Sequence, residues 1–304
     1  MRNVMKAATL ESRFPLMAVE HGCIISKDAD ITVAYRMELP EVFTLTRAEY
    51  EAMHSTWVKA VKVLPEYSIV HKQDIFIEES YRPEACGEER SFLSRSFERH
   101  FNERPYLKHT CYLFLTRTTK EHSRTTSSFN ALTRGFIIPR EMRDKEAVAR
   151  FLECCGQFER IVNDSGLVRM ERLADGEITG TGTSAGIIEK YLSLSQEGCT
   201  CLQDITIGAG EMKIGDSRLC LHTLSDPEDL PSAVGTDSRY ERLSTDRSDC
   251  RLSFAAPIGI LLTCNHIVNQ YVFIDSPAET LQKFEQTARN MHSLSRYSRS
   301  NQIN

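Results

Sequence analysis

The segment Gly182-Thr-Ser-Ala-Gly186 has the residue types of a nucleophile elbow. Its Ser184 satisfies the G-x-S-x-G pattern of serine hydrolases, in which a buried strand delivers the serine to a tight turn that opens a helix. Asp226 and His266 follow in the chain order of such a triad. The residues before Ser184 (174–183) are polar and rich in glycine, so the strand half of the motif is missing. A serine hydrolase that uses Ser184 therefore stays as an alternative function, and no catalytic residue is assigned.

The glycines do not complete a phosphate-binding motif. Gly210 and Gly215 have the Walker A separation, but Asp216 follows where that motif requires lysine. The glycines around Ser184 give G-x-G-x-x-x-G without an apolar strand before it, which departs from the dinucleotide-binding pattern. We therefore expect no cofactor, and we expect Thr183 or Ser184 to cap a helix. The apolar residues of that helix are Ile187, Ile188, Tyr191 and Leu192.

Two short groups of residues could hold a metal ion. Cys199 and Cys201 precede Cys220 and His222, and thiolate and imidazole are the ligands that zinc prefers. The spacing matches no common zinc module, so metal binding by these four residues stays an open question. A separate group of five carboxylates is interpreted as a solvated acidic surface, and no metal ligand is assigned. Its members are Asp226, Glu228, Asp229, Asp246 and Asp249.

The end of the chain predicts a helix with a basic stripe. The stripe comprises Arg289, His292, Arg296 and Arg299, and an apolar stripe of Leu281, Phe284, Ala288 and Met291 lies beside it. The formal net charge of −5 excludes a surface built throughout for nucleic acid, but it allows a regional site. DNA binding through this helix is a second alternative function.

Alternating and helical patterns predict an α+β fold with mixed or antiparallel sheets and packed helices. We expect strands over 22–26, 30–39, 67–77, 110–116, 167–173, 217–224, 251–263 and 270–275, with a turn at 265–269 joining the last pair. The strand over 30–39 alternates strictly and is expected to be half-buried. Helices are expected over 46–64, where Thr46 and Glu49 form a capping box, over 91–105 and 144–164, and from Pro277 onward. The helix over 144–164 is expected to bury one apolar face, which comprises Val148, Phe151, Leu152, Cys155, Phe158 and Val162. The polar segment 117–130 places a boundary near Gly135. The two predicted subdomains are therefore residues 1–135 and 136–304.

Sequence composition indicates a cytoplasmic chain. The N-terminus lacks the apolar run of a secretory signal, and the longest apolar stretch (254–264) is shorter than a membrane span and contains Pro257. Because thiols stay reduced in the cytoplasm, we expect the ten cysteines to be free thiols, most of them in the core. The helical pattern ends at residue 304 with no stop signal, which predicts that the natural protein continues.

Several segments together resemble one family. They are 13–46, 91–105, 158–167, 218–231 and 244–275, which begin with RFPLMAVEHG, SFLSRSFERH, FERIVNDSGL, RLCLHTLSDP and STDRSDCRLS. These segments are similar to the N-terminal region of TraG-type conjugation ATPases, which are carried on conjugative transposons and related to the VirB-type ATPases of type IV secretion. The similarity runs along essentially the whole chain.

The resemblance implies a non-catalytic assembly and docking domain that supports conjugative DNA transfer. The ATP- and Mg-dependent RecA-like motor of the family would follow residue 304, and the basic helix would lead into it. The expected partners are inner-membrane components of the conjugation channel and other subunits of the same ATPase. The expected location is the cytoplasmic face of the inner membrane, where the protein would be peripheral.

Overall fold

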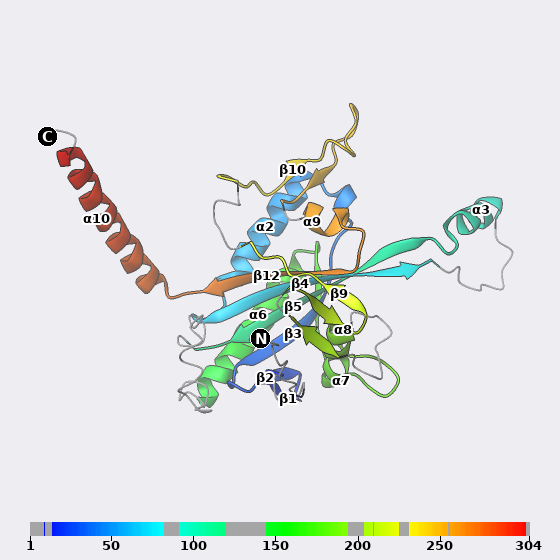
Figure 1. Ribbon diagram of the computed structural model, residues 1–304, viewed down its shortest axis with the longest axis horizontal. Coiled ribbons are helices and arrows are strands. Elements are labelled where there is room, and N and C mark those ends of the chain that lie inside the picture. The colour runs from blue at the N-terminus through cyan, green and yellow to red at the C-terminus, as the bar shows by residue number, and fades with distance from the viewer. Residues whose placement is uncertain are drawn as a thin grey trace.

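The protein has an α+β fold in which helices cover an antiparallel sheet (Figure 1). The computed structural model describes Thr9 and residues 14–81, 91–119, 144–193, 204–208, 210–224, 231–254 and 256–301. The predicted fold class is therefore confirmed.

The main sheet has seven strands, and every neighbouring pair in it is antiparallel. The strand order is β1-β2-β3-β5-β4-β12, and β6 pairs with β3 beyond the part of that strand that pairs with β2. The strands are β1 (Leu16–Glu20), β2 (Cys23–Ser26), β3 (Ile31–Glu38), β4 (Ser68–Ser80), β5 (Pro105–Arg117), β6 (Arg169–Arg172) and β12 (His266–Ile274).

The hairpin of β4 and β5 is longer than the rest of the sheet. Its register runs from Ser68 opposite Arg117 to Ser80 opposite Pro105. Figure 1 shows that its far end extends beyond the other strands and carries helix α3 (Phe92–Phe101). The sequence predicted both strands but not their extensions, because the residues near the tip are polar and do not alternate.

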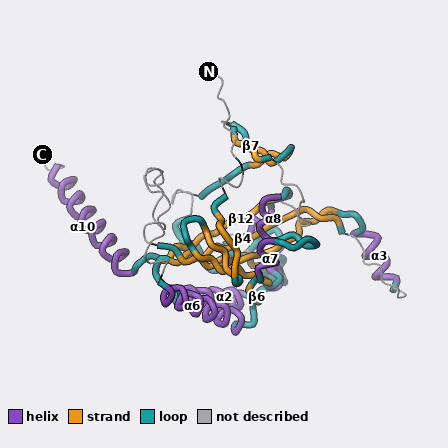
Figure 2. Tube along the Cα trace, turned by 90° about the horizontal axis from the view of Figure 1, so that it is seen from below, coloured by secondary structure: helices purple, strands orange, loops and turns teal. Residues whose placement is uncertain are grey.

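Two helices cover one face of the sheet: α2 (Arg47–Val61) and α6 (Lys145–Asp164) (Figure 2). Helix α2 begins at the predicted capping box, in which the Thr46 hydroxyl accepts from the Glu49 N–H and the Glu49 carboxylate accepts from the Thr46 N–H. The two helices meet where Trp57 contacts Phe158 edge to face at 5.7 Å. The apolar face predicted for α6 is confirmed by its buried residues Phe151, Cys155, Phe158 and Val162.

The opposite face is covered by the short helices α7 (Asp175–Thr179) and α8 (Ile187–Ser193). Ile178 and Ile187 of these helices pack with Ala34 and Ile75 of the sheet in a second apolar cluster. Because Val33 and Tyr35 are buried on the first face, β3 is covered on both faces. The expectation of a half-buried strand is therefore wrong for β3, since its short Ala34 also lies in a core.

The sheet is built from both sides of the predicted subdomain boundary. Strands β6 and β12 come from residues 136–304, and they pair with β3 and β4 from residues 1–135. Helix α6 likewise completes the core under β3 and β5. The boundary itself, at Gly135, lies outside the described residues.

The segment 251–263 is not the predicted strand. It forms the two-residue strand β11 (Arg251–Leu252), which pairs with β10 (Ser238–Arg239), and then helix α9 (Ala256–Leu261). Its Pro257 suits the first turn of a helix, and a Cβ at Gly259 would lie 2.6 Å from the Phe76 ring. Glycine therefore lets α9 pack closely on β4. The turn predicted at 265–269 is also wrong, because β12 already begins at His266 and pairs with β4.

A small sheet, a short 3-10 helix and the C-terminal helix lie outside the main sheet. Strands β7 (Ile205–Ile207), β8 (Met212–Ile214) and β9 (Ser217–Leu219) form a separate small sheet, and η1 (Val42–Thr44) precedes α2. The predicted strand at 217–224 is thus confined to its first three residues. The C-terminal helix α10 (Pro277–Asn301) starts where it was expected.

Candidate docking surfaces

Helix α3 exposes large apolar side chains at the end of the β4–β5 hairpin. Leu93 and Phe97 are 77% and 56% exposed, and Phe92 and Phe101 are also exposed. The sequence predicted a helix packed on the sheet, and this is wrong: Figures 1 and 2 both show α3 held away from the helices that cover the sheet. The apolar pattern of α3 is therefore not explained by the core of this chain.

The base of α3 is held by specific contacts. Backbone hydrogen bonds join Tyr81 to Glu103 and Arg104 across the neck of the hairpin. The Tyr81 ring contacts Phe97 and Phe101 edge to face at 6.3 and 6.4 Å. These contacts fix the orientation of α3, so its apolar side chains are presented in a defined geometry.

The exposed residues of α3 form a stripe. Leu93, Phe97 and Phe101 recur every four residues, which places them along one side of the helix. Arg95 and Arg99 lie on a different side. This spacing is that of an amphipathic helix that binds in the groove of a partner.

Helix α10 is a second exposed surface. Figures 1 and 2 show it projecting from the body of the molecule. Its apolar residues Leu281, Phe284 and Met291 are exposed, and Arg289 forms an ion pair with Glu285 at 3.5 Å. His292 is exposed as well, whereas the side chains of Arg296 and Arg299 lie outside the description. The basic stripe of the DNA-binding alternative is therefore seen only in its first half.

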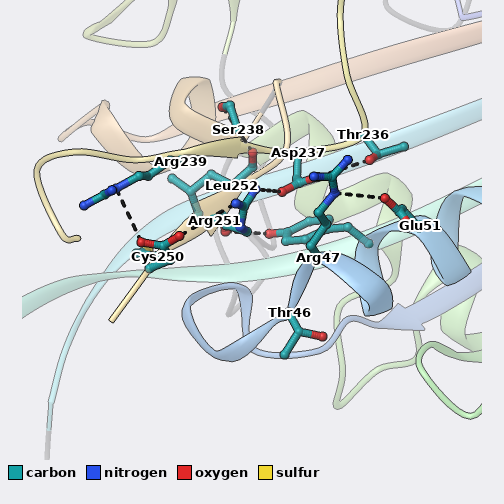
Figure 3. Close-up of polar contacts among 12 residues, drawn as sticks. Thr46, Arg47, Glu51, Thr236, Asp237, Ser238, Arg239, Cys250, Arg251 and Leu252 are labelled. Carbon is teal, nitrogen blue, oxygen red and sulfur yellow. Dashed lines mark hydrogen bonds and ion pairs between the residues drawn. The ribbon is translucent and has the colours of Figure 1, made fainter. Parts of the chain in front are cut away.

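A polar network fastens the β10–β11 hairpin to α2 (Figure 3). The Arg251 guanidinium contacts Asp237 at 2.6 Å and Asp249 at 3.7 Å, and the Tyr50 hydroxyl of α2 donates to the Arg251 carbonyl at 3.0 Å. The hydrogen bond from Arg251 is the main cause of a lowered pKa at Asp237. Asp249 is thus part of an ion-pair network, which the interpretation of a merely solvated acidic surface missed.

The other acidic residues singled out from the sequence form no site in the described structure. Asp246 is exposed, and Asp226, Glu228 and Asp229 lie outside the described residues. No carboxylate group seen here therefore indicates a cation.

A cavity of about 450 Å³ lies between α2, the sheet and the β10–β11 region. Its lining is mainly apolar and includes Met53, Trp57, Val70 and Val272. Lys72 and His54 are the charged or titratable side chains at its wall besides Tyr50. No nucleophile and base are paired among its lining residues. The cavity could therefore accommodate an apolar group, but its lining does not indicate a catalytic site.

A buried carboxylate lies within the sheet. Asp74 accepts a hydrogen bond from His109 at 2.9 Å and pairs with Lys72. Burial alone would raise the pKa of Asp74, but the contacts with His109 and Lys72 outweigh it and lower the pKa to about 2. Burial raises the pKa of the neighbouring Cys111 thiol. Asp74 therefore stays ionised at neutral pH, which suits an ion pair and not a general base.

Sequence reasoning missed this network, although a signal was present. Lys72 and Asp74 stand two residues apart in a strand, so both side chains point to the same face. A charged side chain that is buried in a sheet needs a partner. A partner for Asp74 on the neighbouring strand could therefore have been expected from the sequence.

Ser184 does not occupy a nucleophile elbow. It is exposed, and helix α7 stands before it where the motif requires a strand. Ser184 and Thr181 exchange backbone hydrogen bonds of 2.8 and 3.2 Å, which close a tight turn. His266 lies in β12 with its ring stacked on Phe76, while Asp226 is outside the described residues.

The glycines around Ser184 serve close backbone packing. Gly180 has a φ of +92°, and a Cβ on Gly186 would lie 2.2 Å from the Gly180 nitrogen. Helix α8 begins at Ile187, so Gly186 takes the N-cap position and its N–H is bound by Glu189 at 3.0 Å. The prediction that Thr183 or Ser184 caps this helix is therefore wrong.

The cysteine–histidine group is seen only in part. Cys220 and His222 are exposed, whereas Cys199 and Cys201 lie outside the described residues. Within the described ranges, no three His, Cys, Asp or Glu side chains converge as metal ligands would. The question of a metal at these four positions stays open.

The first part of the chain matches a family model. Residues 3–55 match a family described as "Domain of unknown function, B. Theta Gene description (DUF3875)". The match spans β1 to β3 and the first half of α2. No curated protein matches the chain. Among the described helices, none has the length and apolar character needed to cross a membrane.

Proposed function

We propose that this chain is a non-catalytic assembly and docking domain of a TraG-type conjugation ATPase. The observation that carries the proposal is the exposed apolar stripe of α3, held at the end of the β4–β5 hairpin. It agrees with the docking role that the sequence resemblance implies.

Exposing such a surface to water costs free energy. Leaving several large apolar side chains in water forgoes burial worth about 1.5–3 kcal/mol for each of them. The backbone contacts at Tyr81 nevertheless fix the helix in this position. An ordered and exposed apolar stripe of this kind is typical of a protein–protein contact.

The partners we propose are inner-membrane components of the conjugation channel and other subunits of the same ATPase. The chain would be peripheral to the cytoplasmic face of the inner membrane. ATP and Mg would be bound by the motor of the longer parent protein, and no catalytic or cofactor-binding residue is assigned within these 304 residues.

Competition in donor cells tests the proposal. When the chain is overproduced in donors carrying a TraG-type element, it should occupy the docking site and lower the transfer frequency. Phe97→Asp should abolish this inhibition, because loss of a central aromatic contact weakens binding by about 2 kcal/mol or more, roughly 30-fold. Arg99→Gln on another side of α3 is the matched control and should inhibit like the unmodified chain.

Two results would contradict the proposal. Equal inhibition by the Phe97→Asp chain would show that α3 does not dock. ATP hydrolysis by the purified chain would show that the domain is catalytic.

A further inference from the structure

The outer edge of β12 is a surface that the proposed docking helix does not use. Strand β12 pairs with β4 along all nine of its residues and forms one edge of the main sheet. No strand in the described ranges pairs with its other side. In an antiparallel strand, alternate residues direct their N–H and C=O groups away from the neighbour, so this edge offers a row of donors and acceptors.

Features that normally protect a sheet edge are missing from β12. Proteins protect such edges with charged residues, proline, bulges or short strands. The sequence HIVNQYVFI contains neither charged residues nor proline, and its register with β4 is continuous. Tyr271 and Phe273 are 54% and 56% exposed. The strand is therefore long, regular, apolar and accessible.

The sequence of β12 is complementary to itself when it is reversed. An antiparallel pairing centred on Gln270 places Val268 opposite Val272 and Ile267 opposite Phe273. Asn269 then faces Tyr271, and no like charges meet. Apolar and aromatic residues paired directly across two strands stabilise a sheet.

We propose that β12 pairs edge to edge with β12 of a second copy of this chain, with a twofold axis at Gln270. The contact is isologous, so it closes as a dimer and does not propagate. It joins the two main sheets into one continuous sheet. The inference rests on the proposed docking function and deepens it by naming one partner, another copy, and its surface.

Charge exchange at the twofold axis tests the pairing. Gln270 is exposed and stands opposite Lys72 of β4, so Gln270→Glu should fold normally, and Gln270→Lys should remain folded by circular dichroism with a stability loss of no more than about 1 kcal/mol. Each variant alone places two like charges opposite each other and should dimerise at least about fivefold more weakly in sedimentation experiments. An equimolar mixture of the two should recover dimerisation as a mixed dimer. Lys59→Glu on exposed α2 is the control and should dimerise like the unmodified chain.

Three outcomes would overturn the pairing. They are an unmodified chain that stays monomeric over the concentration range tested, a dimer that is indifferent to charge at position 270, and like-charged variants that the mixture does not rescue. If the unmodified chain stays monomeric, the edge of β12 would instead be open to a strand from a different protein. Sedimentation needs no conjugating cell, so failure here is distinct from failure of the transfer assay, which tests α3.

Discussion

At the scale of single residues, the most informative side chain is Asp74. It is buried in the sheet, yet His109 and Lys72 keep it ionised. Its hydrogen bond with His109 links β4 to β5, and Lys72 of the same strand adds an ion pair. A carboxylate with so low a pKa is a poor proton acceptor at neutral pH. The contacts of Asp74 therefore stabilise the fold and do not indicate a catalytic site.

The lowered pKa of Asp74 predicts how stability depends on pH. Since the folded pKa of about 2 lies below the usual value of 3.8, the ion pair stabilises the fold above pH 4. This contribution, about 2 kcal/mol, is lost as the pH falls from 4 through 2. Asp74→Asn should remove most of this acid dependence, as measured by urea unfolding between pH 6 and 2.

An exposed aspartate provides the control for this measurement. Asp246→Asn should keep the acid dependence of the unmodified chain. If Asp74→Asn also keeps it, the ion pair does not stabilise the fold as described.

At the scale of elements, α3 and α6 show the same sequence pattern and different environments. Both are amphipathic, but α6 buries Phe151 and Phe158 in the core while α3 exposes Phe97. Periodicity shows that a helix has an apolar face, and it does not show whether that face meets the same chain or a partner. The position of α3 depends on the length of the β4–β5 hairpin, which only the structure gives.

This difference in environment predicts opposite effects of substitution on stability. Phe97→Asp should cost about 0.5–1.5 kcal/mol of unfolding free energy, because Phe97 is 56% exposed and loses mainly its edge-to-face contact with Tyr81. Phe158→Ala should cost about 3–5 kcal/mol, because it leaves a cavity between α2 and α6. Urea unfolding of both variants tests the distinction, and a loss for Phe97→Asp as large as that for Phe158→Ala would mean that Phe97 is packed in a core of this chain.

Local signals predicted elements well where the core or a cap fixes them. The capping box at Thr46 and the apolar face of α6 follow from sequence alone. The segment 251–263 was mistaken for a strand because a short apolar run has no clear period. Its helical form depends on the contact of Gly259 with Phe76, which is distant in sequence. The G-x-S-x-G pattern at Ser184 was misleading for a related reason. The segment before Ser184 is a helix followed by a glycine-containing turn, and a nucleophile elbow requires a strand there.

At the scale of the whole molecule, one sheet unites residues from both predicted halves. Strand β12 pairs with β4 at one edge of the sheet, although nearly two hundred residues separate the two strands in the sequence. Helix α6 provides Phe151, Cys155 and Phe158 to the core beneath β3 and β5. The N-terminal strands therefore depend on later segments for their apolar cover.

This dependence predicts that residues 1–135 will not fold alone. Without α6, only α2 would cover the face containing Val33, Tyr35 and Leu113, and the apolar surface left in water would be too large for a stable domain. Circular dichroism and urea titration should show no cooperative unfolding for this fragment, whereas the whole chain should show it. Cooperative unfolding of the fragment would mean that the boundary near Gly135 separates two independent domains.

The central claim is that α3 contacts a channel component, and photo-crosslinking in conjugating cells tests it most directly. A photoreactive phenylalanine analogue at position 97 of the parent protein should crosslink to an inner-membrane channel component identified by mass spectrometry. The same analogue at exposed Lys59 of α2 should not give that product. Absence of a product at position 97, or the same product at both positions, would contradict docking through α3.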